Sequence, residues 1–265
     1  MKKQKCLVLY SGGLDSRLVV KLMQEEGFEV IALYFNLPFG CEKNLDDFVD
    51  VKIVDCCKGE LLEEYLEVIK KGEHGRGKGF NPCRGCKIWM FEKAKEYADK
   101  HGISVIASGE VLGQRPMSQT RFSLDLIDRK LGFEMRRPLI EMGIVGRSRE
   151  KQRELAKKFG VSYPNPGGGC LLCEKMLGNR FKVLIESNLI SEETLKLVNI
   201  GRHYWIDDVW FVVGRNEEEN KVIEGFENSL EGSRGIPGVY FHDVGGRDVA
   251  ERLQKDYKKF SKWKL

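Results

Sequence analysis

A glycine-rich turn with one acid and two hydroxyls, SGGLDS at 11–16, is the part of this sequence best suited to chemistry. An apolar run that predicts a buried strand precedes it, and a helical period of apolar residues follows it. Such a turn presents unpaired backbone N–H groups at a helix N-terminus, which suits a phosphate. Gly12 and Gly13 allow close approach of the backbone, and Ser11 and Ser16 add hydroxyl donors. No lysine follows the second glycine, as one does in a Walker P-loop, so the residues predict another kind of phosphate-binding loop. The alternative is a tight turn with a purely structural role.

Two C-x-x-C pairs form a second group that could do chemistry. Cys83 and Cys86 lie in NPCRGCK, and Cys170 and Cys173 lie in GGGCLLC. A zinc ribbon or finger separates its pairs by only ~12–20 residues, far less than the separation here. Pro82 precedes the first pair at an expected helix start, where the helix dipole favours a thiolate. The pattern leaves open an iron–sulfur site, a structural zinc site and ordinary loop thiols.

These groups need a scaffold that alternates strands and helices. Strand-like runs lie at 5–10, 29–35, 51–54 and 103–108, and helical runs lie at 16–26, 60–71, 88–101 and 148–159. Such alternation predicts parallel strands joined by crossover helices, hence an α/β fold with a doubly wound parallel sheet. Ligands of these sheets bind beyond the C-terminal strand ends, where the turn at 11–16 and the segment after Ser108 both lie.

The alternation changes character from about Gly178. We expect helices near 180–186 and 191–197, a strand at 209–213, a turn at 236–238 and a last helix ending at Trp263. The sequence therefore predicts a first domain at 1–178 and a second, smaller α+β domain at 179–265.

Composition restricts the class of protein. The 265 residues carry 44 basic and 40 acidic side chains, and the net charge of +4 permits a nucleic-acid partner without requiring one. No apolar stretch approaches the ~18 residues of a membrane span, so we expect a cytoplasmic protein with no membrane partner. Eight cysteines in a reducing compartment favour metal or thiol chemistry over disulfides. Cys6 is expected to be a core thiol, and Cys41, Cys56 and Cys57 lie in or beside loops.

SGGLDS resembles the PP-loop, SGGxDS, of ATP pyrophosphatases, which cleave ATP to AMP and pyrophosphate. The resemblance implies that Ser11, Gly12, Gly13 and Ser16 bind the nucleotide. It also implies that Asp15 is catalytic and helps to hold Mg²⁺.

The segment SGEVLGQRPMSQT at 108–120 resembles the second signature of the 4-thiouridine synthetase family. RRPLI at 136–140 matches that family's Arg-Pro-Leu turn, and the resemblance covers about residues 5–175. It implies that four further residues line the nucleotide cleft: Gly109, Glu110, Gly113 and Gln114.

In cluster-dependent tRNA thiolation enzymes, a C-x-x-C pair and one distant cysteine hold a 4Fe–4S cluster whose fourth iron can take sulfide. By that resemblance, Cys83, Cys86 and Cys170 are the ligands. In the branch without clusters, a catalytic cysteine near the position of Cys170 receives sulfur as a persulfide. Cys173 departs from the pattern and is either a fourth ligand or a bystander.

WFVVGRNEEEN and IPGVYFHDVGG in the second domain resemble the small NFACT-R-type domain, which implies contact with RNA. Arg215 would then meet phosphate or stacked bases. His203, Tyr204 and Trp205 would either stack on bases or pack in the core.

These resemblances imply an ATP-dependent tRNA sulfurtransferase that adenylates a uracil carbonyl oxygen and replaces it with sulfur. Its expected cofactors are ATP, Mg²⁺ and a 4Fe–4S cluster, with Zn²⁺ as the alternative metal. Its partners would be tRNA and a sulfur donor, which is either sulfide or a persulfide carrier. Whether the protein forms a homodimer is left open. One rival is a PP-loop ligase acting on a small molecule with a structural zinc site, although such ligases bunch their cysteines near the C-terminus. The other is a non-catalytic RNA-binding module, which an intact SGGLDS disfavours.

Overall fold

The computed structural model describes residues 3–40, 45, 49–77, 79–165 and 169–265. Cys41 and part of the glycine-rich segment before Cys170 lie outside these residues. The chain divides into two units, Met1–Glu174 and Lys175–Leu265, and each contains a sheet of its own. No helix in the described ranges has the length and apolar character that crossing a membrane requires.

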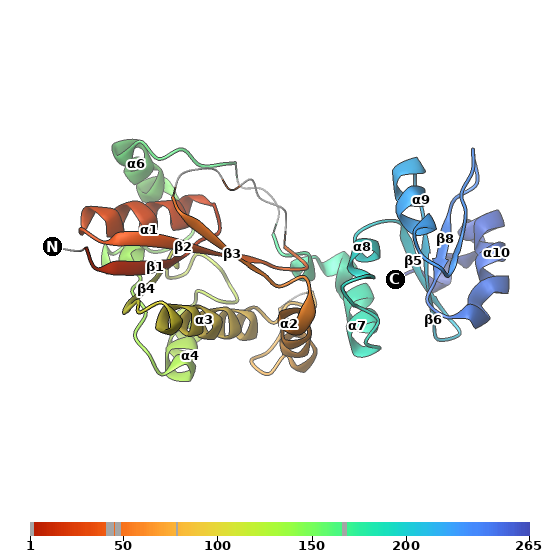
Figure 1. The fold of residues 1–265 in the computed structure, drawn as a ribbon, viewed down its shortest axis with the longest axis horizontal. Helices are drawn as coiled ribbons and strands as arrows, with labels where there is room; N and C mark the ends of the chain where they lie inside the picture. Colours follow the sequence, from red (N-terminus) through yellow and green to blue (C-terminus); the bar gives the residue numbers. More distant parts are fainter. Residues whose placement is uncertain (1–2, 41–44, 46–48, 78, 166–168) are drawn as a thin grey trace. The chain divides into compact units, whose positions relative to one another are not determined.

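Four parallel strands in the order β3-β2-β1-β4 form the centre of the first unit (Figure 1). Their bounds are β1 Lys5–Leu9, β2 Glu29–Asn36, β3 Val51–Asp55 and β4 Val105–Ser108. In the central strand, Val8 lies between Ala32 of β2 and Ala107 of β4, and all three are fully buried. The predicted α/β fold with a parallel sheet is confirmed.

Helices cover both faces of this sheet because the strands carry apolar residues on both sides. On one face α1, Leu14–Glu25, packs with α6, Glu150–Phe159, over a core that includes Val8 and Val19. On the other face lie α2, Gly59–Lys71, and α3, Cys83–Lys100. There the Trp89 ring lies 6.2 Å from Phe35 of β2 and 5.3 Å from Tyr65 of α2, between ring centroids.

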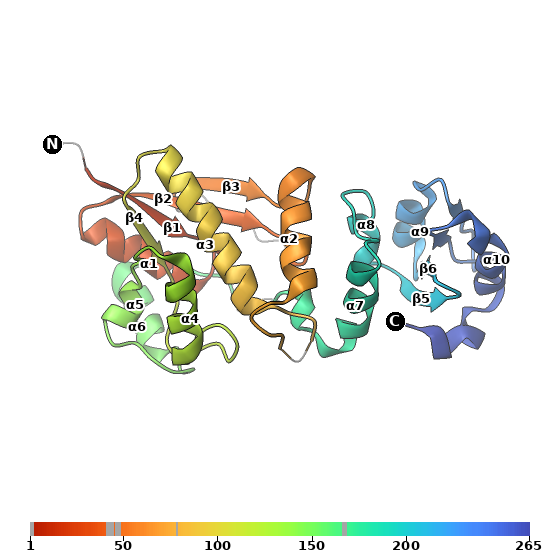
Figure 2. The same cartoon turned by 90° about the horizontal axis from the view of Figure 1, so that it is seen from below.

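Two further helices of this unit were not predicted. They are α4, Arg121–Leu131, which packs beside α3 (Figure 2), and the short α5, Pro138–Glu141. The Thr120 hydroxyl caps α4 by accepting a hydrogen bond from the Ser123 backbone N–H at 3.1 Å. Leu124 and Ile127 are on its buried side, whereas Phe122 leaves 61% of its surface exposed.

The second unit is built on an antiparallel sheet in the order β5-β6-β8-β7. Helices α7, Gly178–Glu186, and α8, Leu195–Val198, precede the sheet. The strands are β5 Arg202–Ile206, β6 Val209–Val213, β7 Ser229–Leu230 and β8 Val239–Phe241, and the helices among and after them are α9 Glu217–Glu224 and α10 Arg247–Asp256. The predicted strand at 209–213 and the helix near 180–186 are confirmed. The helix expected at 191–197 is shorter and begins later, and the last helix gives way to 3₁₀ turns at Tyr257–Trp263.

The aromatic run at 203–205 lies in β5, where the core interpretation is correct for two of its members. His203 is fully buried and Tyr204 is 2% exposed, so neither is available to stack on a base. The His203 Nδ1 accepts a hydrogen bond from the Trp210 indole N–H at 3.0 Å, and burial lowers the pKa of His203 to about 3. Trp205 is half-buried and stacks on His242.

Candidate active site

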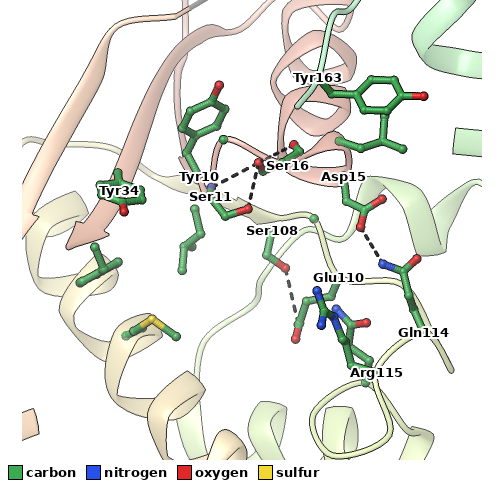
Figure 3. A pocket seen from close by; sticks show the side chains of 18 of the residues that line it. Tyr10, Ser11, Asp15, Ser16, Tyr34, Ser108, Glu110, Gln114, Arg115 and Tyr163 are labelled. Atoms are coloured by element: carbon green, nitrogen blue, oxygen red, sulfur yellow. Dashed lines mark hydrogen bonds between the residues drawn. The ribbon is translucent and has the colours of Figure 1, made fainter. Parts of the chain in front are cut away.

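The SGGLDS turn joins β1 to α1 and is held by its own hydroxyls. Gly12 has a φ of +69°, a conformation that favours glycine. The Ser16 hydroxyl donates to the Gly13 carbonyl at 3.0 Å and accepts the Ser11 backbone N–H at 3.2 Å. The two serine hydroxyls lie 3.3 Å apart (Figure 3). The loop is therefore braced by hydrogen bonds among its own residues.

A cavity of about 880 Å³ opens over this turn at the C-terminal ends of the strands. Its walls come from the turn, the end of β2, one face of α3, the segment after β4 and the first turn of α6. Eight of the nine residues expected to bind nucleotide line it: Ser11, Gly12, Gly13, Asp15, Ser16, Gly109, Glu110 and Gln114. Gly113 does not line it and forms a turn beside it with a φ of +80°.

Gly109 lets two distant sequence motifs touch. A Cβ atom at this position would lie 2.9 Å from the Asp15 carbonyl carbon and 3.0 Å from the Ser16 backbone nitrogen. Both are backbone atoms at the start of α1, so they cannot turn aside as a flexible side chain would. The absent side chain lets the segment after β4 approach Asp15.

The Asp15 carboxylate is only half satisfied. Its Oδ2 accepts a hydrogen bond from the Gln114 amide at 2.7 Å, whereas its Oδ1 is buried without a partner in the described structure. A buried carboxylate oxygen with no donor is costly unless a cation reaches it. Carboxylate oxygen is the ligand that Mg²⁺ prefers, so Asp15 fits the metal that the PP-loop resemblance implies.

Glu110 lines the cavity and sits between two cations. Its carboxylate forms ion pairs with Lys87 of α3 and with Arg137, the latter at 2.8 Å, and it is only 2% exposed. Burial raises the pKa of Glu110, but the Lys87 and Arg137 charges outweigh burial and hold it below its ordinary value. The carboxylate is thus ionised and paired with both cations, and it holds the Lys87 side chain at the cavity wall.

Sequence reasoning missed several cavity residues. Lys87, Arg149, Arg153 and Tyr163 line the cavity, and Gln152 lies behind it, hydrogen-bonded to Gln114. Arg149 and Arg153 belong to a basic cluster visible in the sequence, but such clusters are usually solvated helix faces. The signal that was available is their spacing of four residues, which places both on one side of a helix.

The two C-x-x-C pairs, far apart in the sequence, meet in the first unit. The Phe80 backbone N–H donates to the Leu172 carbonyl at 2.9 Å, which ties the loop before Cys83 to the loop after Cys170. Gly79 is needed for this contact, because a Cβ there would lie 2.3 Å from the Leu172 carbonyl oxygen.

The thiols themselves lie close together. Cys173 raises the pKa of Cys83, and Cys170 raises the pKa of Cys173, which requires the three side chains to be near one another. Cys83 also accepts the Asn81 amide at 3.1 Å, and Cys86 donates to the Tyr65 hydroxyl at 3.7 Å. Cys83 begins α3, one helical turn before the cavity residue Lys87 and so about 6 Å from it along the helix.

The four thiols suit a soft metal by chemistry. Nevertheless, across the described part of the chain no three His, Cys, Asp or Glu side chains already converge as metal ligands. The N-terminal helix dipole was expected to favour thiolates, but hydrogen bonding to Cys173 and burial raise the pKa of Cys83. Burial likewise raises the pKa of Cys86 to about 12. Both thiols are protonated in this arrangement, so a metal would have to displace their protons and turn the side chains together.

Two of the remaining cysteines are fully buried. Cys6 is fully buried in β1, as expected for a core thiol, and burial raises its pKa to about 12. Cys56 is also fully buried.

Comparison with known proteins gives these residues a context. A family model described as "Thiamine biosynthesis protein (ThiI)" matches residues 1–164. The tRNA-specific 2-thiouridylase MnmA of Petrotoga mobilis is 24% identical over 242 residues, which cover 76% of this chain and 63% of that protein. A probable tRNA sulfurtransferase of Methanobrevibacter smithii is 36% identical over 119 residues, covering 42% of this chain and 30% of that protein.

A solved structure, a 4-thiouridine synthetase–RNA complex with bound ATP, is 20% identical with a TM-score of 0.47 and covers 72% of this chain and 53% of that one. The chain therefore spans less than two thirds of the length of each of these three proteins. The family model spans more than half of this chain, including the PP-loop, the first cysteine pair and the whole of the SGEVLGQ segment. The chain belongs to the ThiI family.

Proposed function

We propose that this protein is an ATP-dependent tRNA sulfurtransferase that makes thiouridine. The observation that carries the proposal is the shared cavity. It joins the PP-loop, the SGEVLGQ segment and the helix of the first cysteine pair at the C-terminal edge of one parallel sheet. The names of the relatives, a 2-thiouridylase and a probable tRNA sulfurtransferase, support the same activity.

ATP would bind with its phosphates over the PP-loop. Backbone N–H groups at the start of α1 and the hydroxyls of Ser11 and Ser16 would donate to phosphate oxygens. Lys87 from α3 and Arg149 and Arg153 from the start of α6 add positive charge to the same cavity. Asp15 would hold Mg²⁺ through its unpartnered Oδ1.

The chemistry would proceed in two displacements. A uracil carbonyl oxygen attacks the α-phosphorus of ATP, an O–P bond forms, and pyrophosphate leaves. A sulfur nucleophile then attacks the activated carbon, and AMP leaves with the former carbonyl oxygen. The protein contributes positioning and neutralisation of charge, which dominate catalysis of phosphoryl transfer.

Sulfur would be delivered from the cysteine site. We propose that Cys83, Cys86 and Cys170 hold a 4Fe–4S cluster, which would supply an iron able to carry sulfide. The nearness of Cys173 to Cys83 and Cys170 also permits a four-cysteine zinc site. In that case Cys170 is a zinc ligand and cannot carry a persulfide, so the site would be structural and the sulfur would have to arrive another way.

The second unit would bind the tRNA. The NFACT-R resemblance and the lysine-rich C-terminus support this assignment, together with Arg215, whose guanidinium is half exposed beside Glu219. Since His203 and Tyr204 are buried, binding in this unit would rest on phosphate contacts more than on stacking.

Replacement of the PP-loop acid tests the proposal. Asp15→Asn should fold as the wild type does but lower tRNA- and ATP-dependent pyrophosphate release by about 10²-fold or more, because one charged contact in the transition state is lost. Pyrophosphate release and thiouridine, the latter by mass spectrometry of digested tRNA, are the measurements. Asp50→Asn, an exposed acid outside the cavity, is the matched control. Wild-type rates in the Asp15 variant would contradict the assignment.

A further inference from the structure

A chain of two amides leads from the core of the protein to the PP-loop acid. Gln152, in the first turn of α6, is fully buried. Its amide nitrogen donates to the Gln114 carbonyl oxygen at 2.9 Å, and the Gln114 amide nitrogen donates to Asp15 Oδ2 at 2.7 Å. Three elements that are distant in the sequence, α1, the segment after β4 and α6, thus share one hydrogen-bonded line.

The direction of this line is fixed by chemistry. An ionised carboxylate only accepts hydrogen bonds, so Gln114 must turn its NH₂ group toward Asp15. Its carbonyl oxygen then faces α6 and needs a donor. Gln152 supplies that donor, and its own carbonyl oxygen is buried without a partner in the described structure. Without Gln152, the Gln114 carbonyl oxygen would lose its donor, and only the bond to Asp15 would still hold the amide.

The start of α6 contributes both to the lining of the cavity and to the hydrogen-bonded line behind it. Arg149 and Arg153 line the cavity, while Gln152, between them in the sequence, points inward to Gln114. α6 also packs along α1, the helix that begins beside Asp15. The position of Gln152 is therefore set by the packing that holds the cavity together.

We propose that Gln152 is a positioning residue: acting through Gln114, it holds the Asp15 carboxylate so that Oδ1 faces the bound metal–nucleotide. The inference rests on the proposed function, in which Asp15 holds the metal ion. Gln152 touches neither metal nor nucleotide. Partners of this kind, one step removed from a metal, typically change metal affinity by about 10- to 100-fold when they are replaced.

The test is a double-mutant cycle on metal-dependent nucleotide binding by the full chain. The probe is α,β-methylene-ATP, which cannot be cleaved at the reacting bond, titrated with and without Mn²⁺; bound Mn²⁺ is measured by electron paramagnetic resonance. Gln152→Met keeps the volume and removes the donor, and it should weaken Mn²⁺ binding by about tenfold or more. Gln24→Met, on the exposed side of α1, is the matched control and should change nothing.

Coupling to Asp15 separates positioning from mere packing. If Gln152 acts through the carboxylate, Gln152→Met should have no further effect on metal-dependent binding in an Asp15→Asn background. Unchanged Mn²⁺ affinity in the single Gln152 variant, or an equal loss in both backgrounds, would overturn the inference. Should Gln152→Met fail to fold, Gln152→Leu, which also lacks a hydrogen-bond donor, replaces it in the same cycle.

Failure of the proposed function has a different signature. If Asp15→Asn binds the Mn²⁺–nucleotide as well as the wild type does, the metal role of Asp15 is wrong and the inference falls with it. If the Asp15 variant loses the metal and the Gln152 variant does not, only the inference falls.

Discussion

Replacing Glu110 with glutamine should destabilise the first unit strongly. The substitution keeps the shape of the side chain but removes the charge between Lys87 and Arg137. Breaking one partner of a buried ion pair costs about 3–5 kcal/mol, because the remaining charge is left uncompensated. Arg137 still contacts Asp128 at 2.6 Å, and Lys87 can turn toward the cavity, so we expect a cost at or below the bottom of that range, about 2–3 kcal/mol.

The stability of the first unit can be measured separately by hydrogen exchange of the amides in β4 and α3. Opening of these amides should become roughly 30- to 150-fold more frequent in Glu110→Gln, which corresponds to that free energy. Glu96→Gln is the matched control, since Glu96 forms an exposed pair with Lys93 at 3.4 Å. Exposed pairs contribute about 0–1 kcal/mol, so opening in the control should change only slightly.

The pH dependence checks the cause. Burial raises the pKa of Glu110, but Lys87 and Arg137 lower it below its ordinary value of 4.5. The stabilisation by this carboxylate is therefore complete above pH 4.5 and is lost as the pH falls through the lowered folded-state pKa. The gap between wild type and Glu110→Gln should shrink below pH 4.5. An unchanged opening free energy at neutral pH, or a gap that persists in acid, would refute the electrostatic reasoning.

Two further predictions concern the metal and the RNA. After anaerobic purification, metal analysis and visible absorption of the wild type should show an iron–sulfur cluster. The Cys173→Ser variant should keep this cluster, and single serine variants of Cys83, Cys86 and Cys170 should lose it. Bound zinc together with an equal requirement for Cys173 would instead identify a structural site. The RNA prediction uses variants with glutamine at the exposed residues Lys258, Lys262 and Lys264 near the C-terminus. The slope of log K for tRNA binding against log salt concentration should become shallower by about one for each phosphate contact that is lost. The control Lys95→Gln in α3 should leave this slope unchanged. An identical slope would show that these lysines do not contact the RNA.

Local sequence signals predicted the parallel sheet and the turn at 11–16 because these depend on short-range chemistry. The apolar runs of β1 and β2 are long enough to require burial on both faces, and glycine at position 12 matches a φ of +69°. The second unit was less predictable. β7 has two residues and β8 has three, too few to show a period, and the polar and aromatic residues of β5 read equally well as a binding surface.

For the candidate site, the sequence determined the chemical groups, and the tertiary structure decided their partners. The motifs contained Asp15, Glu110, Gln114 and the four cysteines, but no local rule pairs Glu110 with Lys87 or directs the thiols of both pairs to one place. Gln152 carried no signal at all, because a buried amide on an amphipathic helix resembles any polar helix residue until Gln114 lies against it. Such contacts join residues far apart in the chain, and they exist only after the sheet and its helices have packed.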